Sequence, residues 1–216
     1  MSVQPREFNI ADGFINMIDT GLRTLLNNPA VTGRANPADS HDDIEMDDAQ
    51  KKHIAGLMRI NHCGEVCAQG LYQGQALTAK LPEVREKMEE SAAEENDHLA
   101  WTAGRVEEMG GKLSILNPIF YVGSVAIGAA AGLAGDKWSL GFVAETEYQV
   151  VKHLDGHLEQ IPEQDKKSRS ILKLMKDDEL NHATKAIEHG AEDLPAGIKH
   201  LMNLTSKLMT RTTYHI

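Results

Sequence analysis

The sequence has few of the residues on which secreted scaffolds and nucleic-acid-binding proteins depend. Only two cysteines occur among its 216 residues, which excludes a disulfide-built secreted domain and suits a reducing compartment. Aromatic residues make up 5% of the chain, too few for platforms on which bases stack. Basic residues are outnumbered, since 22 Lys and Arg against 32 Asp and Glu give a net charge of −10. Such an acidic body repels phosphate backbones, so we expect no nucleic-acid partner.

The rest of the composition is that of a folded protein. Hydrophobic residues account for 41% and charged residues for 25% of the chain, close to the average for soluble domains. A chain of 216 residues forms one domain or two small ones and can bury a sizeable core. Asp12 and Asp19 interrupt the apolar residues near the N-terminus, so a signal-peptide pattern is absent. We therefore expect a cytosolic protein.

Helical periodicity runs through the chain, while strand signals are scarce. Residues 8–26 carry apolar side chains at spacings of three and four, which predicts an N-terminal amphipathic helix. The polar residues that follow, with Gly33 and Pro37, are interpreted as a linker. Four longer amphipathic segments come next, at about 47–79, 83–109, 138–160 and 166–189. The sequence thus predicts an N-terminal helix and linker, residues 1–46, and a helical bundle, residues 47–216.

Each of the four longer segments places a carboxylate in the middle of its apolar stripe. The four residues are Glu65, Glu95, Glu147 and Glu179. Glu145 competes for the position in the third segment, but Val143 and Leu154 share the face of Glu147. A buried, isolated carboxylate costs several kcal/mol, so buried acids are normally paired or bound to metal. Four of them, one on each helix, need a common partner of high positive charge.

The spacing of the carboxylates supports a shared site. Glu65 and Glu95 are 30 residues apart, and Glu147 and Glu179 are 32 apart. Leu81-Pro82 and Pro162 lie near the two midpoints, where a turn would make each pair of helices a hairpin. The two carboxylates of a hairpin would then lie at the same height, roughly 22 Å from their turn.

A histidine follows the second carboxylate of each hairpin by three positions, at His98 and His182. Residues three apart on a helix share a face, so each Glu and His can reach one metal ion. Two helices with a single carboxylate and two with Glu-x-x-His are the ligand set of a dinuclear iron or manganese site in a four-helix bundle. Oxygen-rich ligands favour these metals over zinc. The sequence therefore predicts an all-α, ferritin-like bundle with a long crossover between its hairpins.

The crossover, residues 113–135, contains no charged side chain and is long enough for a transmembrane helix. Asn117-Pro118 interrupts the run, and many Gly and Ala residues make it only mildly apolar. A single span would also separate the three candidate ligands before it from the three after it. We therefore expect no span. Two alternatives stay open: a helix buried against the bundle, and a surface that dips into a bilayer or admits a lipid-like substrate.

The C-terminal segment predicts a further amphipathic helix. Its apolar face is formed by Ile198, Leu201, Met202, Leu208 and Met209, and its positive charges are Lys199, Lys207 and Arg211. This pattern is typical of a packed surface helix, and also of a helix that lies in a membrane interface.

Several stretches between residues 47 and 216 form a set that resembles a known family. They are Arg59-Ile60-Asn61-His62-Cys63-Gly64-Glu65, Glu94-Glu95-Asn96-Asp97-His98, the Gly- and Ala-rich crossover, Glu145-Thr146-Glu147 and Asp178-Glu179-Leu180-Asn181-His182. The set resembles the demethoxyubiquinone hydroxylases of ubiquinone biosynthesis, which are ferritin-like di-iron monooxygenases bound peripherally to membranes. Asn-His-x-Gly-Glu is its most specific part, because ferritins in general lack it. Residues 1–46 fall outside the resemblance.

The resemblance implies a cofactor, a reaction and a location. Two iron ions per subunit would be held by Glu65, Glu95, His98, Glu147, Glu179 and His182. His153 matches a histidine that the family places near the iron centre, outside the ligand set. The expected reaction is the O₂-dependent hydroxylation of a polyprenylated demethoxy-benzoquinol, 2-polyprenyl-3-methyl-6-methoxy-1,4-benzoquinol. Peripheral contact with the cytoplasmic face of the cell membrane is also implied, with a homo-oligomer or a helper protein of the pathway as a further partner.

Three other functions fit parts of the pattern. A ferritin- or rubrerythrin-like ferroxidase would use the same ligands, but it predicts a soluble shell of many subunits, and the apolar crossover favours the hydroxylase. A di-iron oxygenase with another substrate would share the whole site, whereas a non-enzymatic membrane adaptor would bind no metal.

Cys63 and Cys67 are interpreted as packed thiols. His153 and His157 lack the adjacent acid of zinc-binding helices, which favours surface or supporting roles.

Overall fold

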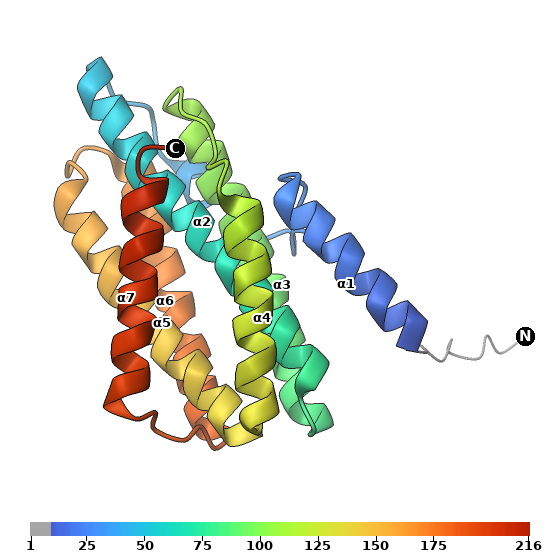
Figure 1. Cartoon of the computed structure of the whole chain (residues 1–216). Helices are drawn as coiled ribbons and strands as arrows, with labels where there is room; N and C mark the ends of the chain where they lie inside the picture. Colours follow the sequence, from blue (N-terminus) through green and yellow to red (C-terminus); the bar gives the residue numbers. More distant parts are fainter. Residues whose placement is uncertain (1–9) are drawn as a thin grey trace, which may run out of the picture.

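The computed structural model of the protein describes residues 10–216, with side chains from Ile15 onward. Within this range the chain forms seven α-helices and one short 3-10 helix, and no β-strand (Figure 1). In chain order these are α1 (Ile10–Leu25), η1 (Pro37–Ser40), α2 (Asp48–Thr78), α3 (Pro82–Glu108), α4 (Asn117–Ala134), α5 (Asp136–Gln160), α6 (Lys166–Glu188) and α7 (Ala196–Thr213). The predicted all-α fold is confirmed. The predicted start of the first helix, at residue 8, lies outside the described residues.

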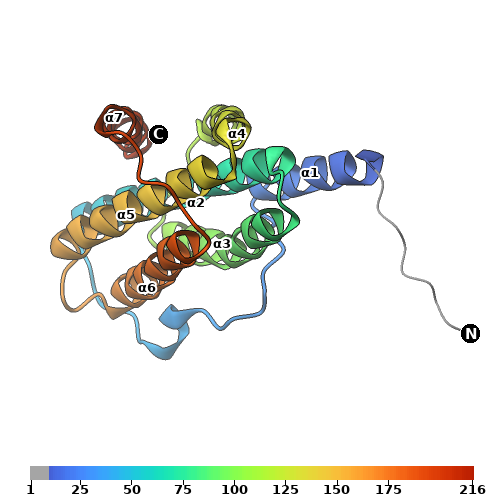
Figure 2. The same cartoon turned by 90° about the horizontal axis from the view of Figure 1, so that it is seen from below.

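Helices α2, α3, α5 and α6 form the bundle, as two hairpins joined by short turns. Pro82 lies in the first turn of α3, where the missing N–H of proline is not needed. Asp47 and Gln50 cap the start of α2 reciprocally, and the side chain of Asp165 caps α6. Pro82 and Asp165 thus start the second helix of each hairpin just after the turn that the carboxylate spacing requires. Figure 2 shows the resulting layers, with α2 and α5 stacked on α3 and α6.

The two largest apolar clusters of the bundle core are separated by a polar layer. One cluster contains Ile54, Met58, Trp101, Leu154, Ile171, Leu172 and Met175. The other contains Tyr72, Val84, Met88, Leu140, Val143 and Ala186. Each bundle helix contributes to both clusters, so burial of its two apolar ends, at about 1.5–3 kcal/mol per large side chain, holds its middle residues inside the protein.

The predicted crossover is helix α4, and small residues let it pack closely along α2. A side chain added at Gly74 or Gly128 would overlap the facing backbone. Pro118 does not interrupt the helix, because it lies in the first turn. The opposite face is exposed: Val122 keeps 64% of its surface accessible. Among the described helices, α4 is the one long and apolar enough to cross a membrane, with 28% of that stretch buried. One face of α4 is therefore packed and the other is free.

The two terminal helices leave apolar residues exposed. Figure 2 shows α7 beside α4, on the outer side of the α2 and α5 layer. Leu201, Leu204 and Leu208 of α7 are exposed. In α1 the apolar stripe that includes Ile18 and Leu22 also faces outward, while Gly21 packs against Tyr121 of α4. The N-terminal helix is thus amphipathic as predicted, but most of its described apolar stripe faces away from the bundle, and only Leu25, at its end, packs against a core cluster.

Candidate metal centre

The polar layer of the bundle brings all six predicted ligands together. Their ligand atoms form two groups, and within each group these atoms lie within 4.8 Å of one another. The groups are Glu65, Glu95, His98 and Glu179, and Glu95, Glu147, Glu179 and His182. Glu95 and Glu179 belong to both. The assignment of these side chains as metal ligands stays a prediction, but the geometry that it requires is present.

All six side chains are almost fully buried, with no more than 3% of any residue accessible. They lie at mid-helix, between the two apolar clusters, because the stripes on either side carry every helix into the core. Ionised carboxylates in such a place are stable only when they are paired or bound to a cation. Because its carboxylates are buried, the layer strongly favours the binding of a cation.

The two histidines point the same ring nitrogen, Nδ1, at the carboxylates of this layer. Nδ1 of His98 lies 2.8 Å from an oxygen of Glu95 and 3.3 Å from one of Glu179. Nδ1 of His182 lies 3.1 Å from an oxygen of Glu179 and 3.3 Å from one of Glu95. Each imidazole thus points Nδ1 at the two shared glutamates, which is how one His could serve each of two metal ions.

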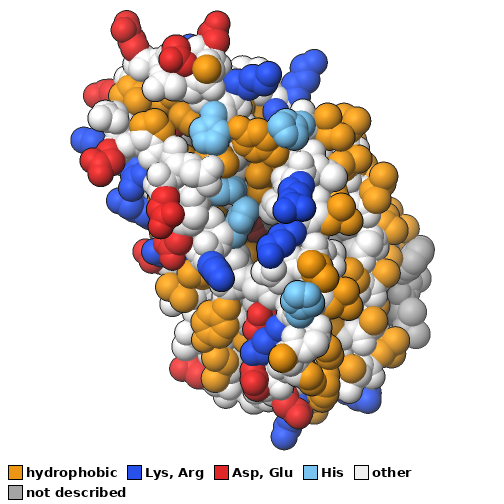
Figure 3. All heavy atoms as spheres, turned by 60° about the vertical axis from the view of Figure 1, so that its left-hand side comes forward, with side chains coloured by type: hydrophobic (Ala, Val, Ile, Leu, Met, Phe, Trp, Pro, Cys, Tyr) orange, Lys and Arg blue, Asp and Glu red, His pale blue; other side chains and the backbone are white. Residues whose placement is uncertain are grey.

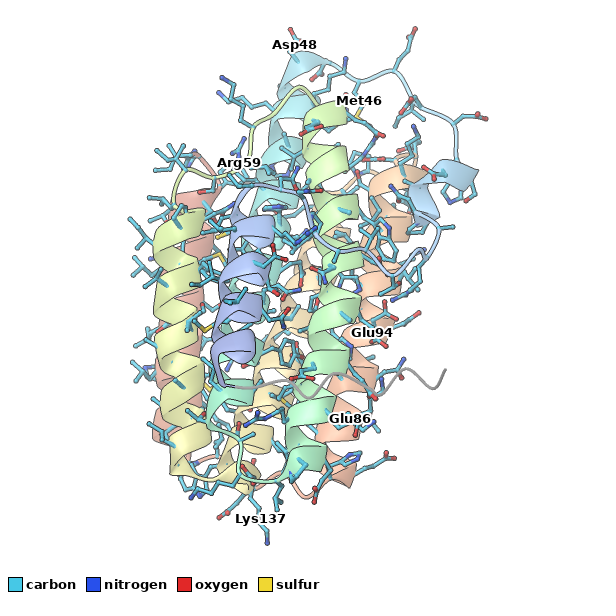
Figure 4. The ribbon with its side chains drawn as sticks, turned by 90° about the vertical axis from the view of Figure 1, so that its right-hand side faces the viewer. Met46, Asp48, Arg59, Glu86, Glu94 and Lys137 are labelled. Carbon is cyan, nitrogen blue, oxygen red and sulfur yellow. The ribbon has the colours of Figure 1, made fainter. Side chains whose placement is uncertain are left out.

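The outer nitrogens of the two histidines are held by acids that the sequence analysis did not single out. Nε2 of His98 lies 2.9 Å from Asp178, and Nε2 of His182 lies 2.5 Å from Glu94. The pairing is crossed, since each acid comes from the other hairpin, and Figure 4 shows Glu94 on α3 at the side of α6. Such partners fix the tautomer and orientation of metal-ligating histidines. A signal was available: each acid immediately precedes the Glu of a Glu-x-x-His motif.

In the metal-free layer, protons on some of the carboxylates and on the imidazoles balance the charge. Burial and, after it, the neighbouring carboxylates raise the pKa of Glu65 and Glu147 well above their usual range. Burial also disfavours ionised Glu95, but the two imidazoles outweigh it and lower the pKa of Glu95. Despite burial, the surrounding carboxylates raise the pKa of His98 and His182. Metal binding to such groups displaces protons.

A pair of divalent cations fits what the layer leaves unsatisfied. Oε1 of Glu95 and Oε1 of Glu179 are buried and accept no well-aligned hydrogen bond, although each lies 3.3 Å from an imidazole Nδ1. A buried acceptor left unpaired costs about 1–3 kcal/mol, and these two oxygens belong to the glutamates common to both groups. Four carboxylates and two imidazoles are donors that suit iron or manganese. The residues present therefore fit the dinuclear site that the sequence predicts.

On the third bundle helix, the structure separates the two competing glutamates. Glu147 is buried in the ligand layer and accepts a hydrogen bond of 2.6 Å from the hydroxyl of Tyr72. Glu145 lies outside the layer, with an oxygen 3.2 Å from Nζ of Lys199 on α7. The apolar stripe therefore selected the glutamate that lies in the buried layer, and Tyr72 is a partner that the stripe alone did not reveal.

His153 and the cysteines lie near the site without joining it. His153 lines the neighbouring cavity, and its ring packs against His157 with the centroids 4.0 Å apart. It belongs to neither candidate ligand group, so its supporting role stays a prediction. Cys63 is buried and Cys67 is partly buried, and both are free thiols, in line with the packing role expected for them.

A cavity of about 450 Å³ leads from the protein surface to the ligand layer. Its walls come from α2, α4, α5 and α7, and they are mostly apolar, with Leu71, Ile127 and Met202 among them. Glu65, Glu147 and Glu179 form part of its lining. The arrangement can admit an elongated apolar molecule and bring one end of it to the candidate metal site.

Comparisons with known proteins point to one family. The family model described as "Ubiquinone biosynthesis protein COQ7" matches residues 52–213. A protein of Legionella pneumophila (strain Paris) is 56% identical over 212 residues, which covers 98% of this chain and all of the relative. A protein of Pseudomonas putida (strain W619) is 54% identical, with 98% of both chains covered, and one of Chromobacterium violaceum is 53% identical, with 95% of this chain and 99% of the relative covered. All three relatives are named 3-demethoxyubiquinol 3-hydroxylase.

Proposed function

The chain belongs to the family of ubiquinone biosynthesis protein COQ7, and from this premise we propose that it hydroxylates a demethoxyubiquinol at a di-iron centre. As the names of its relatives state for them, the protein is a hydroxylating oxidoreductase of ubiquinone biosynthesis. The finer parts of the proposal are two iron ions, O₂ as the oxidant and a polyprenylated quinol as the substrate. The observation that carries them is the meeting of six buried ligands at the inner end of an apolar cavity.

The residues of the layer would hold the iron and control its surroundings. Four glutamates supply the negative charge that two ferrous ions need, and one imidazole completes each position. Bound iron would supply the redox chemistry with O₂ that ring hydroxylation requires. Tyr72 holds one carboxylate of the layer in place, and Asp178 and Glu94 hold the two histidines. The apolar clusters above and below the layer exclude bulk water.

The cavity suggests how the substrate is bound. The quinol ring would lie against the side of the layer formed by Glu65, Glu147 and Glu179, and the isoprenoid tail would follow the apolar walls between α4 and α7. Polar groups are scarce there, but Gln149 and His153 line the same space and could orient the ring oxygens. A tail emerging between two helices with exposed apolar faces would pass directly into a bilayer.

Peripheral membrane contact is therefore part of the proposal. The outer faces of α4 and α7 expose Val122, Leu204 and Leu208. Figure 3 shows hydrophobic side chains gathered on one side of this face, next to a strip of basic and histidine side chains. Apolar residues bordered by positive charge suit the surface of an anionic leaflet. On this proposal the protein works at the cytoplasmic face of the cell membrane.

A turnover experiment tests the hydroxylase directly. The full chain, loaded anaerobically with ferrous iron, would be incubated with a reductant, O₂ and a demethoxy-quinol, and the product identified by mass. We expect one hydroxyl group to be added, with its oxygen derived from labelled O₂. Glu147→Ala should abolish the product, while Glu145→Ala, two residues away and outside the layer, should retain it. Equal activity in the two variants would contradict the assignment.

Vesicle sedimentation tests the membrane part. The native chain should sediment with vesicles that contain anionic lipid, and replacing Val122 and Leu208 by Glu should reduce the bound fraction. Neither residue lines the cavity, so turnover of a short-tailed quinol should survive. Unchanged sedimentation of the double variant would contradict the proposed face.

A further inference from the structure

The segment between α1 and α2 is fastened across the outside of the metal layer. The backbone N–H of Thr32 donates to Asp97 of α3 at 2.8 Å, and its hydroxyl donates to the other oxygen of the same carboxylate. Two residues further on, Arg34 forms an ion pair of 2.6 Å with Asp178 of α6. Figure 4 shows this segment crossing in front of α3 and reaching the side of α6. We call residues 30–40 the strap.

Arg34 reaches the metal layer through a single shared atom. Oδ2 of Asp178 lies 2.6 Å from Nη2 of Arg34 and 2.9 Å from Nε2 of His98. The guanidinium of Arg34 also lies over the ring of Trp101, 5.1 Å from its centroid, and Trp101 packs against His98 at 5.5 Å between ring centroids. Arg34 therefore contacts both of the groups that hold the His98 ring in position.

The other histidine of the layer has weaker support within residues 15–216. There, Glu94, the partner of His182, has one basic neighbour besides that histidine, Lys185, and the two charges are 3.7 Å apart. The Glu94 and Lys185 side chains are 35% and 43% accessible, whereas those of Asp178 and Arg34 are 14% and 33% accessible. Long, exposed ion pairs contribute little, while a short charge-assisted hydrogen bond to a largely buried acid is stronger. The two candidate metal positions therefore have similar ligands, but the acid behind His98 is held more firmly than the acid behind His182.

We propose that Arg34 is a positioning residue that fixes Asp178 against His98 and so makes the metal position containing His98 the tighter of the two. The inference rests on the proposed metal centre and adds an order of affinity to it. When the guanidinium is absent, Asp178 is free to turn toward solvent, and His98 loses the acceptor that holds its Nδ1 toward the metal. The position with His182 does not depend on the strap and keeps its affinity.

Anaerobic titration of the full, metal-free chain with Fe²⁺, followed by Mössbauer spectroscopy, tests this order. The native protein should bind two ions with different affinities. Replacing the acid beside a metal-bound histidine usually weakens metal binding by about 10–100-fold; Arg34→Gln acts one contact further out, so we expect a loss of about threefold to tenfold at one position. The altered signal should be the one that Asp178→Asn alters. Arg34→Lys should restore part of the affinity, because the charge returns without the planar fork.

Arg23→Gln is the matched control, because Arg23 also pairs with an aspartate at 2.6 Å but lies on α1, away from the layer. It should bind iron as the native chain does. Two native-like affinities in Arg34→Gln would overturn the inference and leave the metal centre intact. Equal weakening of both positions, with a lower melting temperature of the metal-free protein, would mean that the strap only stabilises the fold and would also overturn it. A native chain that binds no iron would refute the proposed centre itself.

Discussion

Two layers of the same bundle contain buried histidines, and they have opposite electrical character. In the ligand layer, carboxylates surround His98 and His182 and raise the pKa of both rings. In the second group, which consists of His62 beside Asn117 and His157 beside Asn61 and which we call the neutral layer, burial is the main cause and lowers the pKa of His62 to about 4 and that of His157 to about 3. The first pair is therefore held as cations, or ready for a metal, while the second pair is held neutral.

The neighbours of the second pair explain the difference. Nδ1 of His157 lies 2.9 Å from the side-chain oxygen of Asn61, and Nδ1 of His62 lies 3.4 Å from the side-chain nitrogen of Asn117. An amide can hydrogen-bond one nitrogen of a neutral imidazole without adding charge. Burial is thus common to both layers and does not identify a metal site; the number of carboxylates around the ring does. The following predictions would break or sharpen this comparison.

The largest effect is expected from Glu179→Ala, because Glu179 belongs to both candidate ligand groups. The variant should bind essentially no iron and show no turnover, as measured by metal analysis and by the hydroxylation assay. Its metal-free form should be less stable than the native one, since Glu179 lies 3.1 Å from Nδ1 of His182 and 3.3 Å from Nδ1 of His98 and its removal leaves buried charge without a partner. Full iron content in this variant would contradict the ligand assignment.

The next largest effect is expected from Asp178→Asn, which removes the negative charge beside Nε2 of His98 and keeps the shape of the side chain. Metal affinity should fall by about 10–100-fold at one position, measured by competition with a chelator. The matching change in the neutral layer is Asn61→Ser, which removes the amide beside His157 and should leave both metal affinities unchanged. If the two variants behave alike, the distinction between the layers is wrong.

The neutral layer should make its own contribution to the pH dependence of stability. Below pH 6.5, the ordinary pKa, the unfolded chain protonates His62 and His157, but the folded chain does not until about pH 4 and about pH 3. The contribution of these two histidines to the free energy of unfolding should therefore fall by a few kcal/mol as pH drops from 6.5 to 4. The raised pKa of Glu65 and Glu147 acts in the opposite direction, so the contribution is read as the difference in slope, from urea denaturation at several pH values, between the native chain and the variant with His62→Gln and His157→Gln. Equal slopes in the two proteins would count against the buried neutral pair.

The smallest effect is expected from His157→Phe at neutral pH. The substitution fills a similar space but leaves the Asn61 oxygen without a donor, which costs about 1–3 kcal/mol. Thermal unfolding should report that loss, while iron content stays at the native value. His98→Phe is the counterpart in the ligand layer and should reduce iron binding. Loss of iron in His157→Phe would place that ring in the metal site after all.

The sequence was sufficient for the bundle and for the ligand layer, because both depend on periodicity within single helices. Apolar stripes set the helices, and Glu147 was separated from Glu145 by the face that it shares with Val143. The structure adds what depends on contacts between segments far apart in the chain. Asp178 pairs with a histidine 80 positions away, and the strap had no periodic signal at all. The stripe of α1 showed that the helix is amphipathic, but periodicity does not tell which face is covered.

The central claim is that buried carboxylates persist in this bundle because a pair of divalent cations neutralises them. Its most direct test is to dialyse the full, metal-free chain against ferrous iron without oxygen and to count the bound ions per chain by elemental analysis. The account predicts two ions in the native protein and essentially none in Glu179→Ala. A native chain that emerges with no bound iron, or a variant that binds as much as the native chain, would contradict it.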